Sequence, residues 1–447
     1  MTDLAMRDTI AALATSPGQA GIAIVRISGP DAEKALRALF IPYQKNCPYE
    51  DRRLYLGRLM ANGQEIDECM AVLMRGPKSY TRQDVAELQL HGGEWAAGAA
   101  LNALYTQGVR AAEPGEFTLR AYLNGRVDLS GAEAVMRLIG AEGERAARAA
   151  LRQLNGGASQ FITQIQQTLL QMISSLEAAI DYPDEIEESE TAADLAAGAR
   201  ALAQTLEKAA DERSAHLLSE GLNVALLGRP NAGKSTLLNA LLGEERAIVT
   251  DVPGTTRDII RGVIYLNGLK INLLDTAGLR NGGDKVEQIG VERALNAAKN
   301  ADLALVLADI NGGQAQDAQA LFSSIQTKDK LLVLTKADLG GEETPIPSGA
   351  LRISAKTGAG LDSLKAQLAA FAAGVGDSPL TMRRHIDLAL KARSSLLSAA
   401  AAFENGSPLE FGAVDLHEAL NALSSITGDR VDEKLLDDIF SRFCVGK

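Results

Sequence analysis

The sequence predicts a multidomain protein with an α+β N-terminal domain, a discontinuous α-helical domain and an α/β domain inserted between the two helical parts. Its length of 447 residues exceeds what one compact core holds, because domains usually contain about 100 to 200 residues. Helix-type patterns rich in Ala, Gln, Glu and Arg are interrupted by alternating strands and helices, and then return. The predicted boundaries are 1–118, 119–220, 221–372 and 373–447.

The N-terminal part mixes short apolar runs with Gly and Pro breaks. Runs typical of strands cover Ile22 to Ser28, Leu54 to Leu59 and Val85 to Leu90, and helical stretches lie between them. This mixture predicts an α+β domain over residues 1–118.

The next part is predicted to be helical. Apolar residues recur there at steps of three or four, which is the spacing of one helix face, at Phe161, Ile165, Leu169, Met172, Leu176 and Ile180. The same style returns beyond residue 373. We therefore expect residues 119–220 and 373–447 to pack as one helical domain, since the ends of an inserted domain often lie close together.

The inserted part alternates apolar strands with helices, which predicts a parallel sheet covered on both faces. The predicted strands are Asn223 to Leu227, Ile271 to Leu274, Leu303 to Leu307, Leu331 to Leu334 and Leu351 to Ser354.

The composition indicates a globular protein of a reducing compartment. It is 46% hydrophobic and 23% charged, and its three cysteines form no CxxC pair, which favours a cytoplasmic location. We expect no membrane-spanning helix, because breakers interrupt the long apolar runs. The net charge of −12 weakens a nucleic-acid-binding interpretation without excluding it, since fields at a protein surface are local.

A phosphate-binding loop follows the first strand of the inserted domain. Gly228-Arg229-Pro230-Asn231-Ala232-Gly233-Lys234-Ser235 matches GxxxxGK[ST], and a helical pattern comes next. Glycines let backbone N–H groups surround phosphates, Lys234 supplies a cation, and Ser235 offers a hydroxyl to Mg²⁺. The residues predicted to contact a nucleotide here are Asn231, Ala232, Gly233, Lys234, Ser235 and Thr236.

Two further loops complete the predicted phosphate and metal site. The loop around Gly254-Thr255-Thr256 offers the hydroxyl of Thr256 as a second Mg²⁺ ligand, and Asp275 and Gly278 follow a strand in a DxxG motif. The nucleotide-contacting residues predicted in these loops are Thr250, Asp251, Val252, Pro253, Gly254, Thr255, Thr256, Asp275, Thr276, Ala277 and Gly278.

A third pair of motifs predicts guanine as the base. In Thr335-Lys336-Ala337-Asp338, the Asp338 carboxylate can accept hydrogen bonds from guanine N1–H and N2–H₂, which adenine lacks. Ser354-Ala355-Lys356 resembles the segment that contacts guanine O6 in G proteins. Thr335 stands where Asn is usual, which leaves the affinity for guanine open.

The residue that would orient the attacking water is not evident from these motifs. Ras-like proteins carry Gln directly after DxxG, and Leu279 occupies that position here. Glu287 is a candidate because it lies a dozen residues after Asp275 and carries a carboxylate. From the residues alone, an exposed acid without a catalytic role is the favoured interpretation.

The whole chain resembles the family of tRNA modification GTPases called MnmE or TrmE. The resemblance rests on Pro-Gly-Glu-Phe at 114–117, Leu-Asn-Gly-Arg at 123–126, the inserted G domain and Phe-Cys-Val-Gly-Lys at 443–447. It implies a homodimeric, K⁺-stimulated GTPase that forms a heterotetramer with the flavoprotein MnmG. The pair would add an aminomethyl or carboxymethylaminomethyl group to C5 of the wobble uridine, U34, of certain tRNAs.

The resemblance also implies roles for individual residues. Glu287 becomes the catalytic residue, contact between two G domains becomes the activating event, and the K⁺ ligands become Asn231, Thr250, Val252 and Thr255. The N-terminal domain would bind 5-formyl-tetrahydrofolate or a related folate through Arg26, Glu87, Arg126 and Lys447. Taken one by one from the sequence, these four are more readily explained as surface charges.

Several alternatives stay open. Cys444 either serves the modification reaction, as the resemblance implies, or is a small buried residue beside Phe440 and Phe443. His91 has no partner at metal-ligand spacing and is predicted to be structural. A ribosome-assembly factor switched by GTP is the alternative function, although no RNP or KH-like pattern is present. A degenerate G domain kept for dimerisation is opposed by the intact phosphate and base motifs.

Overall fold

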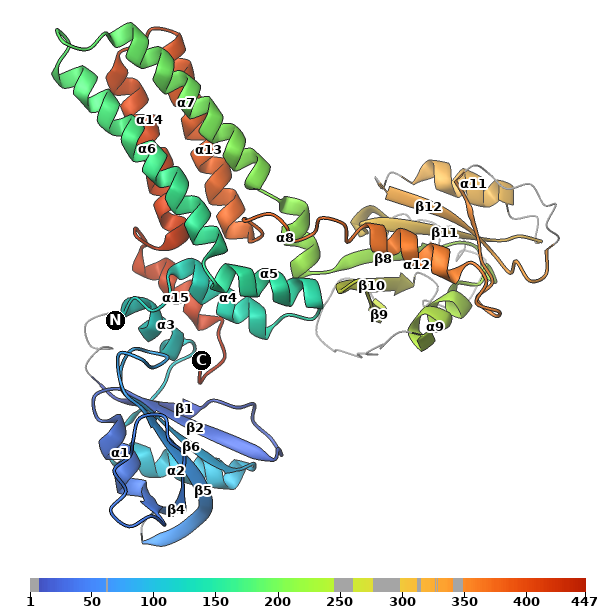
Figure 1. Ribbon diagram of the computed structural model, residues 1–447. Helices are drawn as coiled ribbons and strands as arrows, with labels where there is room; N and C mark the ends of the chain where they lie inside the picture. The colour runs from blue at the N-terminus through green and yellow to red at the C-terminus, as the bar shows by residue number, and fades with distance from the viewer. Residues whose placement is uncertain are drawn as a thin grey trace. The chain divides into compact units, whose positions relative to one another are not determined.

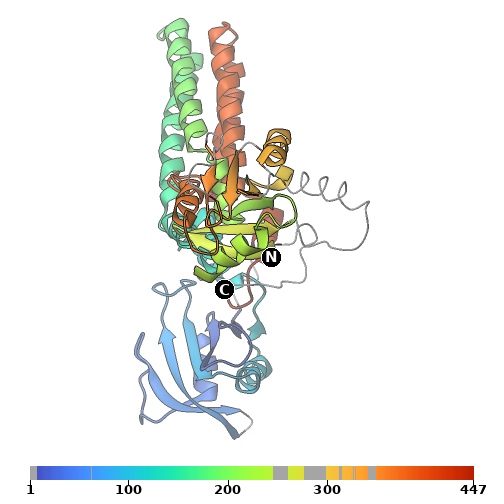
Figure 2. The ribbon, with the colours of Figure 1, turned by 90° about the vertical axis from the view of Figure 1, so that its right-hand side faces the viewer.

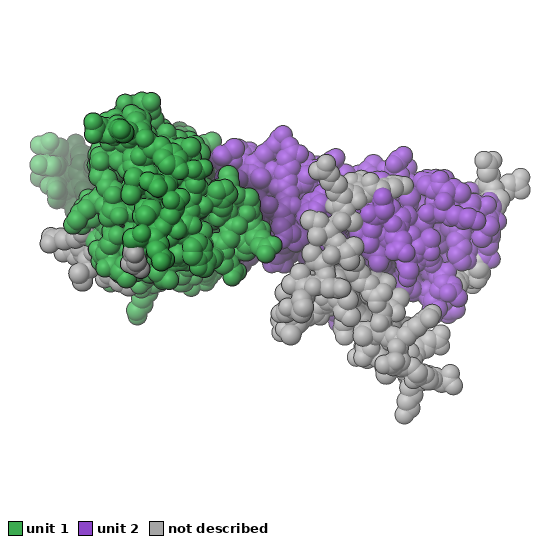
Figure 3. Space-filling view, turned by 90° about the horizontal axis from the view of Figure 1, so that it is seen from below, with its two compact units in different colours: residues 1–136, 153–191, 408–447 green, residues 137–152, 192–407 purple. Residues whose placement is uncertain are grey.

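The computed structural model describes residues 8–61, 63–244, 260–275, 298–311, 315–325, 327, 329–340 and 349–447. The chain divides into two compact units, shown in Figure 3. The first unit comprises Met1–Met136, Gln153–Thr191 and Pro408–Lys447, and the second comprises Arg137–Arg152 and Ala192–Ser407.

The first unit contains a seven-stranded sheet with the order β3-β4-β5-β6-β2-β1-β7, seen in blue from two directions in Figures 1 and 2. Neighbouring strands are antiparallel except β1 and β7. The strands are β1 (Ile10–Leu13), β2 (Ile22–Ser28), β3 (Phe40–Pro42), β4 (Tyr55–Ala61), β5 (Gln64–Met74), β6 (Val85–His91) and β7 (Arg110–Ala111). The three strands predicted from the sequence are thus confirmed as β2, β4 and β6.

Two helices, α1 (Ala32–Leu39) and α2 (Glu94–Thr106), complete the core of this sheet. Buried residues of α1, such as Leu36, and of α2, such as Leu104, share one apolar cluster with alternate residues of the strands. Burial of alternate strand residues is the pattern expected of a sheet that packs on one face. The predicted α+β architecture is therefore confirmed.

The first unit also contains five helices: α3 (Glu116–Leu123), most of α4 (Leu129–Ile139), α6 (Gly157–Asp181), α14 (Leu409–Thr427) and α15 (Glu433–Ser441). Helices α6 and α14 pack side by side (Figure 1). The helix predicted from the apolar row Phe161 to Ile180 is confirmed as α6, and only part of that row is buried. Ile165, Leu169 and Leu176 are buried, whereas Phe161, Met172 and Ile180 are half-buried. The other buried residues of the helix include Ile162, Ile173 and Ala179.

The second unit contains a six-stranded sheet with the order β13-β12-β11-β8-β10-β9. All neighbouring pairs are parallel except β9 and β10. The strands are β8 (Leu222–Leu227), β9 (Ile260–Leu266), β10 (Leu269–Asp275), β11 (Leu303–Asp309), β12 (Asp329–Thr335) and β13 (Leu351–Arg352). The five predicted strands are confirmed, although β13 spans only two of its predicted residues. The antiparallel edge strand β9 was not predicted.

Helices cover both faces of this sheet. Val224 and Leu226 of β8 belong to one buried cluster with α9 (Lys234–Glu244) and α12 (Leu361–Ala370), while Ala225 and Leu227 belong to a second cluster that includes α11 (Ala315–Ser324). Strands that are buried on both faces appear in the sequence as continuous apolar runs. The α/β prediction for the inserted domain is therefore confirmed.

Long helices in the second unit include α13 (Arg383–Glu404) and most of α7 (Glu188–Ala209), with the shorter α8 (Glu212–Ser219) following α7. Arg200 on α7 pairs with Glu404 on α13 at 2.5 Å. The two predicted helical segments contribute helices to both units, so their packing as one domain stays a prediction, as do its boundaries. In the described part of the chain, every helix is too short or too polar to cross a membrane.

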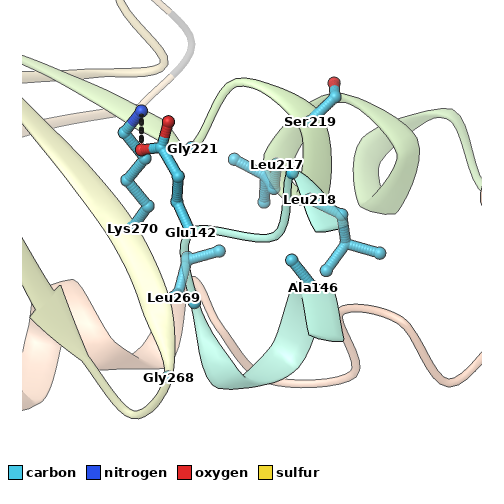
Figure 4. Close-up of a pocket in the computed structure, with 11 residues that line it drawn as sticks. Glu142, Ala146, Leu217, Leu218, Ser219, Gly221, Gly268, Leu269 and Lys270 are labelled. Carbon is cyan, nitrogen blue, oxygen red and sulfur yellow. Dashed lines mark ion pairs between the residues drawn. The ribbon is translucent and has the colours of Figure 1, made fainter. Parts of the chain in front are cut away.

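The hairpin between β9 and β10 is held by α5 (Glu144–Leu154) and the residues before it. The N–H of Arg145 donates to Gly268 O at 3.1 Å, and the side chain of Glu142 pairs with Lys270 (Figure 4). A Cβ on Gly143 would lie 2.7 Å from Gly268 O, so only glycine permits this approach. A small pocket here is lined by Gly140, Glu142, Gly143, Ala146, Leu217, Leu218, Ser219, Gly221, Gly268, Leu269 and Lys270.

Candidate nucleotide and ligand sites

The phosphate-binding motif forms a tight turn between β8 and α9. Gly228 has a φ of +145°, and an added Cβ would lie 2.4 Å from Leu307 O on the neighbouring strand β11. Gly233 has a φ of +88° and Asn231 a φ of +64°. Because L side chains rarely adopt these angles, the glycines at both ends allow the loop to close. The turn therefore has the strand-loop-helix context that the motif requires.

The ammonium of Lys234 lies within this turn. Its Nζ donates to Gly228 O at 2.5 Å and to Arg229 O at 2.9 Å, and the residue is buried. The next two residues, Ser235 and Thr236, are exposed in the first turn of α9. A cation and the N-terminal end of a helix thus lie together at the carboxyl end of β8. This is an electrostatic environment suited to phosphate.

Asp275 lies at the same end of the sheet, where the parallel strands β8 and β10 finish. It is the last residue of β10 and pairs in register with Leu226, the second-last residue of β8. The carboxyl ends of the two parallel strands therefore point toward the loop that follows β8. The pocket beside Glu142 and Lys270 lies at the opposite end of β10 and is separate from this edge.

The other predicted loop residues fall outside the described residues. They are Thr250, Asp251, Val252, Pro253, Gly254, Thr255, Thr256, Thr276, Ala277, Gly278 and Glu287. The Mg²⁺ ligand Thr256, three of the four K⁺ ligands and the catalytic assignment of Glu287 consequently stay predictions.

The predicted base-recognition motif is joined to the phosphate loop by Thr335. This buried residue ends β12, and its Oγ1 lies 2.8 Å from Ala232 O and 3.1 Å from Ala308 O. The threonine that replaces the usual Asn therefore connects the two loops through its hydroxyl.

The rest of this motif is held by two side-chain contacts. Ser354 Oγ donates to Asp338 Oδ1 at 2.6 Å, and Asp338 is itself exposed, as is Lys356 two residues beyond Ser354. Lys336 has a φ of +58° and its Nζ lies 2.6 Å from Asp309 Oδ2. Partial burial raises the pKa of Asp309, but the ammonium of Lys336 and the Asn311 N–H outweigh it and hold the pKa below its ordinary value. Asp309 was missed from the sequence, because nothing in the local motif marks it.

A second cluster of predicted residues lies in the first unit, where adjacent strands β2 and β6 meet. Arg26 is in register with Glu87, and Arg26 Nε lies 2.9 Å from Glu87 Oε1. Arg26 Nη1 also approaches Gly446 O at 3.4 Å. A Cβ on Gly446, whose φ is +94°, would lie 2.2 Å from Leu13 O, so the C-terminal segment crosses close to β1. The half-buried Lys447 is thereby held near the same strands.

Arg126 reaches this cluster through Tyr80, a residue that the sequence analysis missed. The Arg126 guanidinium carbon lies 4.9 Å from the centroid of the Tyr80 ring, and that of Arg26 lies 5.7 Å from the same centroid. Arg126 Nη1 donates to Ser79 O at 2.7 Å. Two guanidiniums, one carboxylate and the C-terminal segment are therefore brought together from positions that are distant in the sequence.

The structure contradicts one of the two interpretations of Cys444, whereas the structural role predicted for His91 stays a prediction. Cys444 is exposed, so its interpretation as a buried apolar residue is wrong, although Phe440 and Phe443 are buried as expected. His91 is exposed, and its Nδ1 lies 2.7 Å from Asp67 Oδ1, which raises the pKa of the imidazole. Within the described residues, no group of three or more His, Cys, Asp or Glu side chains is arranged to hold a metal ion.

Comparisons with known proteins cover almost the whole chain. Residues 9–126 match the family model described as the GTP-binding protein TrmE N-terminus, and residues 129–444 match the MnmE helical domain. A tRNA modification GTPase MnmE from Synechococcus sp. (strain RCC307) is 43% identical, with 100% of both chains covered. Its counterpart from Syntrophotalea carbinolica is 42% identical over 98% of this chain and 99% of its own.

Among solved structures, the G domain of the T. maritima FeoB iron transporter is 30% identical. The similarity covers 34% of this chain and 98% of that one, with a TM-score of 0.25.

Proposed function

The chain belongs to the MnmE family of tRNA modification GTPases, and from this premise we propose that it couples K⁺-stimulated GTP hydrolysis to modification of the wobble uridine U34 of certain tRNAs. With the flavoprotein MnmG it would add an aminomethyl or carboxymethylaminomethyl group at C5. The observation that carries this proposal is the 43% identity over the full length of a relative that bears the name tRNA modification GTPase. The chain is itself a GTPase, as its family is.

In the proposed nucleotide site, each motif has a distinct task. Lys234 leaves its loop carbonyls to contact the β- and γ-phosphates, and backbone N–H groups of residues 231–236 surround them. Ser235 and Thr256 would hold Mg²⁺, which neutralises charge on the phosphates, while Asp275 holds a water of its shell. Asp338 selects guanine, and Ser354 keeps the carboxylate of Asp338 oriented through their 2.6 Å hydrogen bond.

We further propose that K⁺ supplies the positive charge that an arginine finger supplies elsewhere. Asn231, Thr250, Val252 and Thr255 would hold the ion, and Glu287 would position the attacking water. Contact between the G domains of a homodimer would complete this arrangement. The proposal answers a chemical need, because Leu279 cannot orient water and an unassisted site turns over slowly.

Hydrolysis measured in KCl and in NaCl tests the K⁺ assignment directly. We expect faster turnover in KCl, and equal rates in the two salts would exclude K⁺ stimulation. In KCl, Glu287→Ala should lower kcat by about 10²-fold, whereas full turnover by this variant would remove Glu287 from the mechanism.

The proposed ligand of the first unit is 5-formyl-tetrahydrofolate or a related folate, bound by Arg26, Glu87, Arg126 and Lys447. The residues suit such a molecule. A carboxylate can accept hydrogen bonds from the pterin edge, and guanidinium and ammonium groups can pair with the glutamate tail. The clustering of Arg26, Glu87 and Arg126 around Tyr80 supports this assignment, since isolated surface charges would not converge.

The function as a whole is tested by nucleoside analysis of tRNA from cells that lack the protein. Loss of the C5 modification at U34 is expected, and it should return with the wild-type gene. An unchanged wobble uridine would favour the alternative function, a GTP-switched ribosome-assembly factor. Co-purification with MnmG in a complex of two copies of each chain would support the proposed heterotetramer. A cytoplasmic location is part of the same proposal.

A further inference from the structure

The segment 79–83 connects the sheet of the first unit to the segment that carries Arg126. On the sheet side, Thr81 Oγ1 lies 2.7 Å from Ser28 Oγ, and both hydroxyls are buried. On the other side, Asn124 Nδ2 donates to Thr81 O at 2.6 Å, and Arg82 Nη1 donates to Asn124 O at 3.0 Å. Hydrogen bonds thus hold the backbone of this segment on both sides. They fix the position of the residue between Ser79 and Thr81.

That residue is Tyr80, whose hydroxyl has a hydrogen-bonding partner and whose ring lies close to two cations. Its hydroxyl lies 3.0 Å from Thr118 Oγ1 on α3. The guanidinium carbons of Arg126 and Arg26 lie 4.9 Å and 5.7 Å from the ring centroid. A guanidinium within about 6 Å of an aromatic centroid is attracted by the electrons of the ring. One ring therefore attracts two like charges that would otherwise repel each other.

The two guanidiniums differ in their other partners. Arg26 is mostly buried and paired with Glu87, so its charge is largely neutralised. Arg126 is exposed, its guanidinium donates to the neutral carbonyl of Ser79, and no carboxylate of the described residues lies within 4 Å of it. The Arg126 cation is accordingly the one available to an anionic ligand.

We propose that Tyr80 is the positioning residue of this site, holding Arg126 so that its guanidinium meets a carboxylate of the ligand while Arg26 stays paired with Glu87. The inference rests on the proposed folate site, and it assigns the glutamate tail to Arg126. Tyr80 itself acts through the arginines and does not serve as a stacking surface for the pterin. Replacing the ring should therefore weaken recognition of the tail more than recognition of the pterin.

Calorimetric titration of the full-length protein tests this division. The ligands are 5-formyl-tetrahydrofolate and the N-methylamide of 5-formyl-tetrahydropteroate, a pteroate that lacks the glutamate tail and carries no carboxylate. For Tyr80→Leu we expect up to about tenfold weaker binding of the folate, because a released Arg126 must be ordered when the ligand binds, at a cost of ~0.5 to 1.5 kcal/mol, and nearly unchanged binding of the pteroate. Tyr80→Phe keeps the ring and should stay within about threefold of the wild type.

Two further variants separate positioning from general damage to the fold. Tyr43→Leu removes an exposed tyrosine elsewhere in the same domain, whose hydroxyl contacts Glu68, and should bind both ligands as the wild type does. Pentafluorophenylalanine at position 80 preserves the shape of the ring but reverses its electrostatics, so it should weaken folate binding as Tyr80→Leu does. Urea unfolding monitored by near-ultraviolet circular dichroism, to which the buried Tyr49 and Tyr55 contribute, reports whether each variant is folded.

The outcomes distinguish this inference from the function on which it rests. If the wild type binds neither ligand, the folate assignment fails. If the wild type binds the folate and the pentafluorophenylalanine protein binds it equally well, the folate assignment stands and the role of Tyr80 is refuted. Equal losses for the folate and the pteroate would also refute it, because a ring that stacks on the pterin produces that result.

Discussion

Arg120→Met is expected to destabilise the first unit strongly, because it removes a fully buried cation from a network of charges. The Arg120 guanidinium donates to Asp8 Oδ1 at 2.6 Å, to Glu116 Oε1 at 2.9 Å and to Gln83 Oε1 at 3.1 Å. Arg120 is 0% exposed and Glu116 is 4% exposed. After the substitution, the buried Glu116 carboxylate keeps Arg110 as a cationic partner but loses Arg120.

The magnitude follows from these contacts. Removing one partner of a buried ion pair costs about 3 to 5 kcal/mol. The lower end applies here because Arg110 still pairs with Glu116 at 2.5 Å and with Asp8 at 2.6 Å, and because the Asp8 side chain is 37% exposed. We therefore expect a loss of ~3 kcal/mol in the free energy of unfolding, which lowers the urea midpoint by roughly 1 to 2 M.

Near-ultraviolet circular dichroism during urea unfolding provides the assay, since the buried Tyr49 and Tyr55 give this part of the chain a signal that is lost with their packing. The matched control is Arg58→Met, which breaks an exposed 3.5 Å pair with Glu65 in the same sheet. Exposed pairs contribute about 0 to 1 kcal/mol, so the control should barely move the midpoint. Equal midpoints for Arg120→Met and Arg58→Met would refute the argument from burial.

The same network predicts how the effect depends on pH. Burial raises the pKa values of Asp8 and Glu116, but hydrogen bonds and charges from Arg110 and Arg120 outweigh burial, so both pKa values lie below their ordinary values of 3.8 and 4.5. Carboxylates with lowered pKa values stabilise the folded state above their unfolded pKa values, and this stability is lost as the pH falls through the folded values. The difference between wild type and Arg120→Met should therefore be complete at pH 7 and shrink below about pH 4.

Three further substitutions test the second unit. Asp338→Asn should weaken GTP binding by about 10²-fold while leaving the melting temperature unchanged, because charge-assisted hydrogen bonds to the base are lost, and fluorescent-nucleotide titration measures this. Gly143→Ala should destabilise the unit by about 1 to 3 kcal/mol in thermal unfolding, since the added carbon lies 2.7 Å from Gly268 O. Gly243→Ala, where nothing lies within 4 Å, is its control and should not lose stability. Thr335→Val should weaken nucleotide binding by about tenfold, whereas Thr335→Ser keeps the hydroxyl and should not, and equal affinities would disprove the link between the two loops.

Most of the secondary structure and the nucleotide motifs follow from local sequence. β8 and the glycines at 228 and 233 are recognisable without a structure, because apolar periodicity and positive φ angles are properties of short segments. The family also follows from short motifs, as the full-length matches confirm. The spacing of apolar residues in α6 did not indicate which of them are buried, because two adjacent apolar rows run along this helix.

Other features depended on the tertiary structure, because they join residues that are far apart in the chain. Tyr80 meets Arg26 and Arg126, and Asp309 meets Lys336, only after strands from different parts of the sequence have paired. The exposure of Cys444 beside two buried phenylalanines was likewise decided by packing. Local sequence determined which segments form helices, strands and phosphate-binding turns, since those depend on neighbouring residues. Only the folded chain decided which charges are neutralised and which remain available to a ligand, since electrostatic partners are set by distance in space.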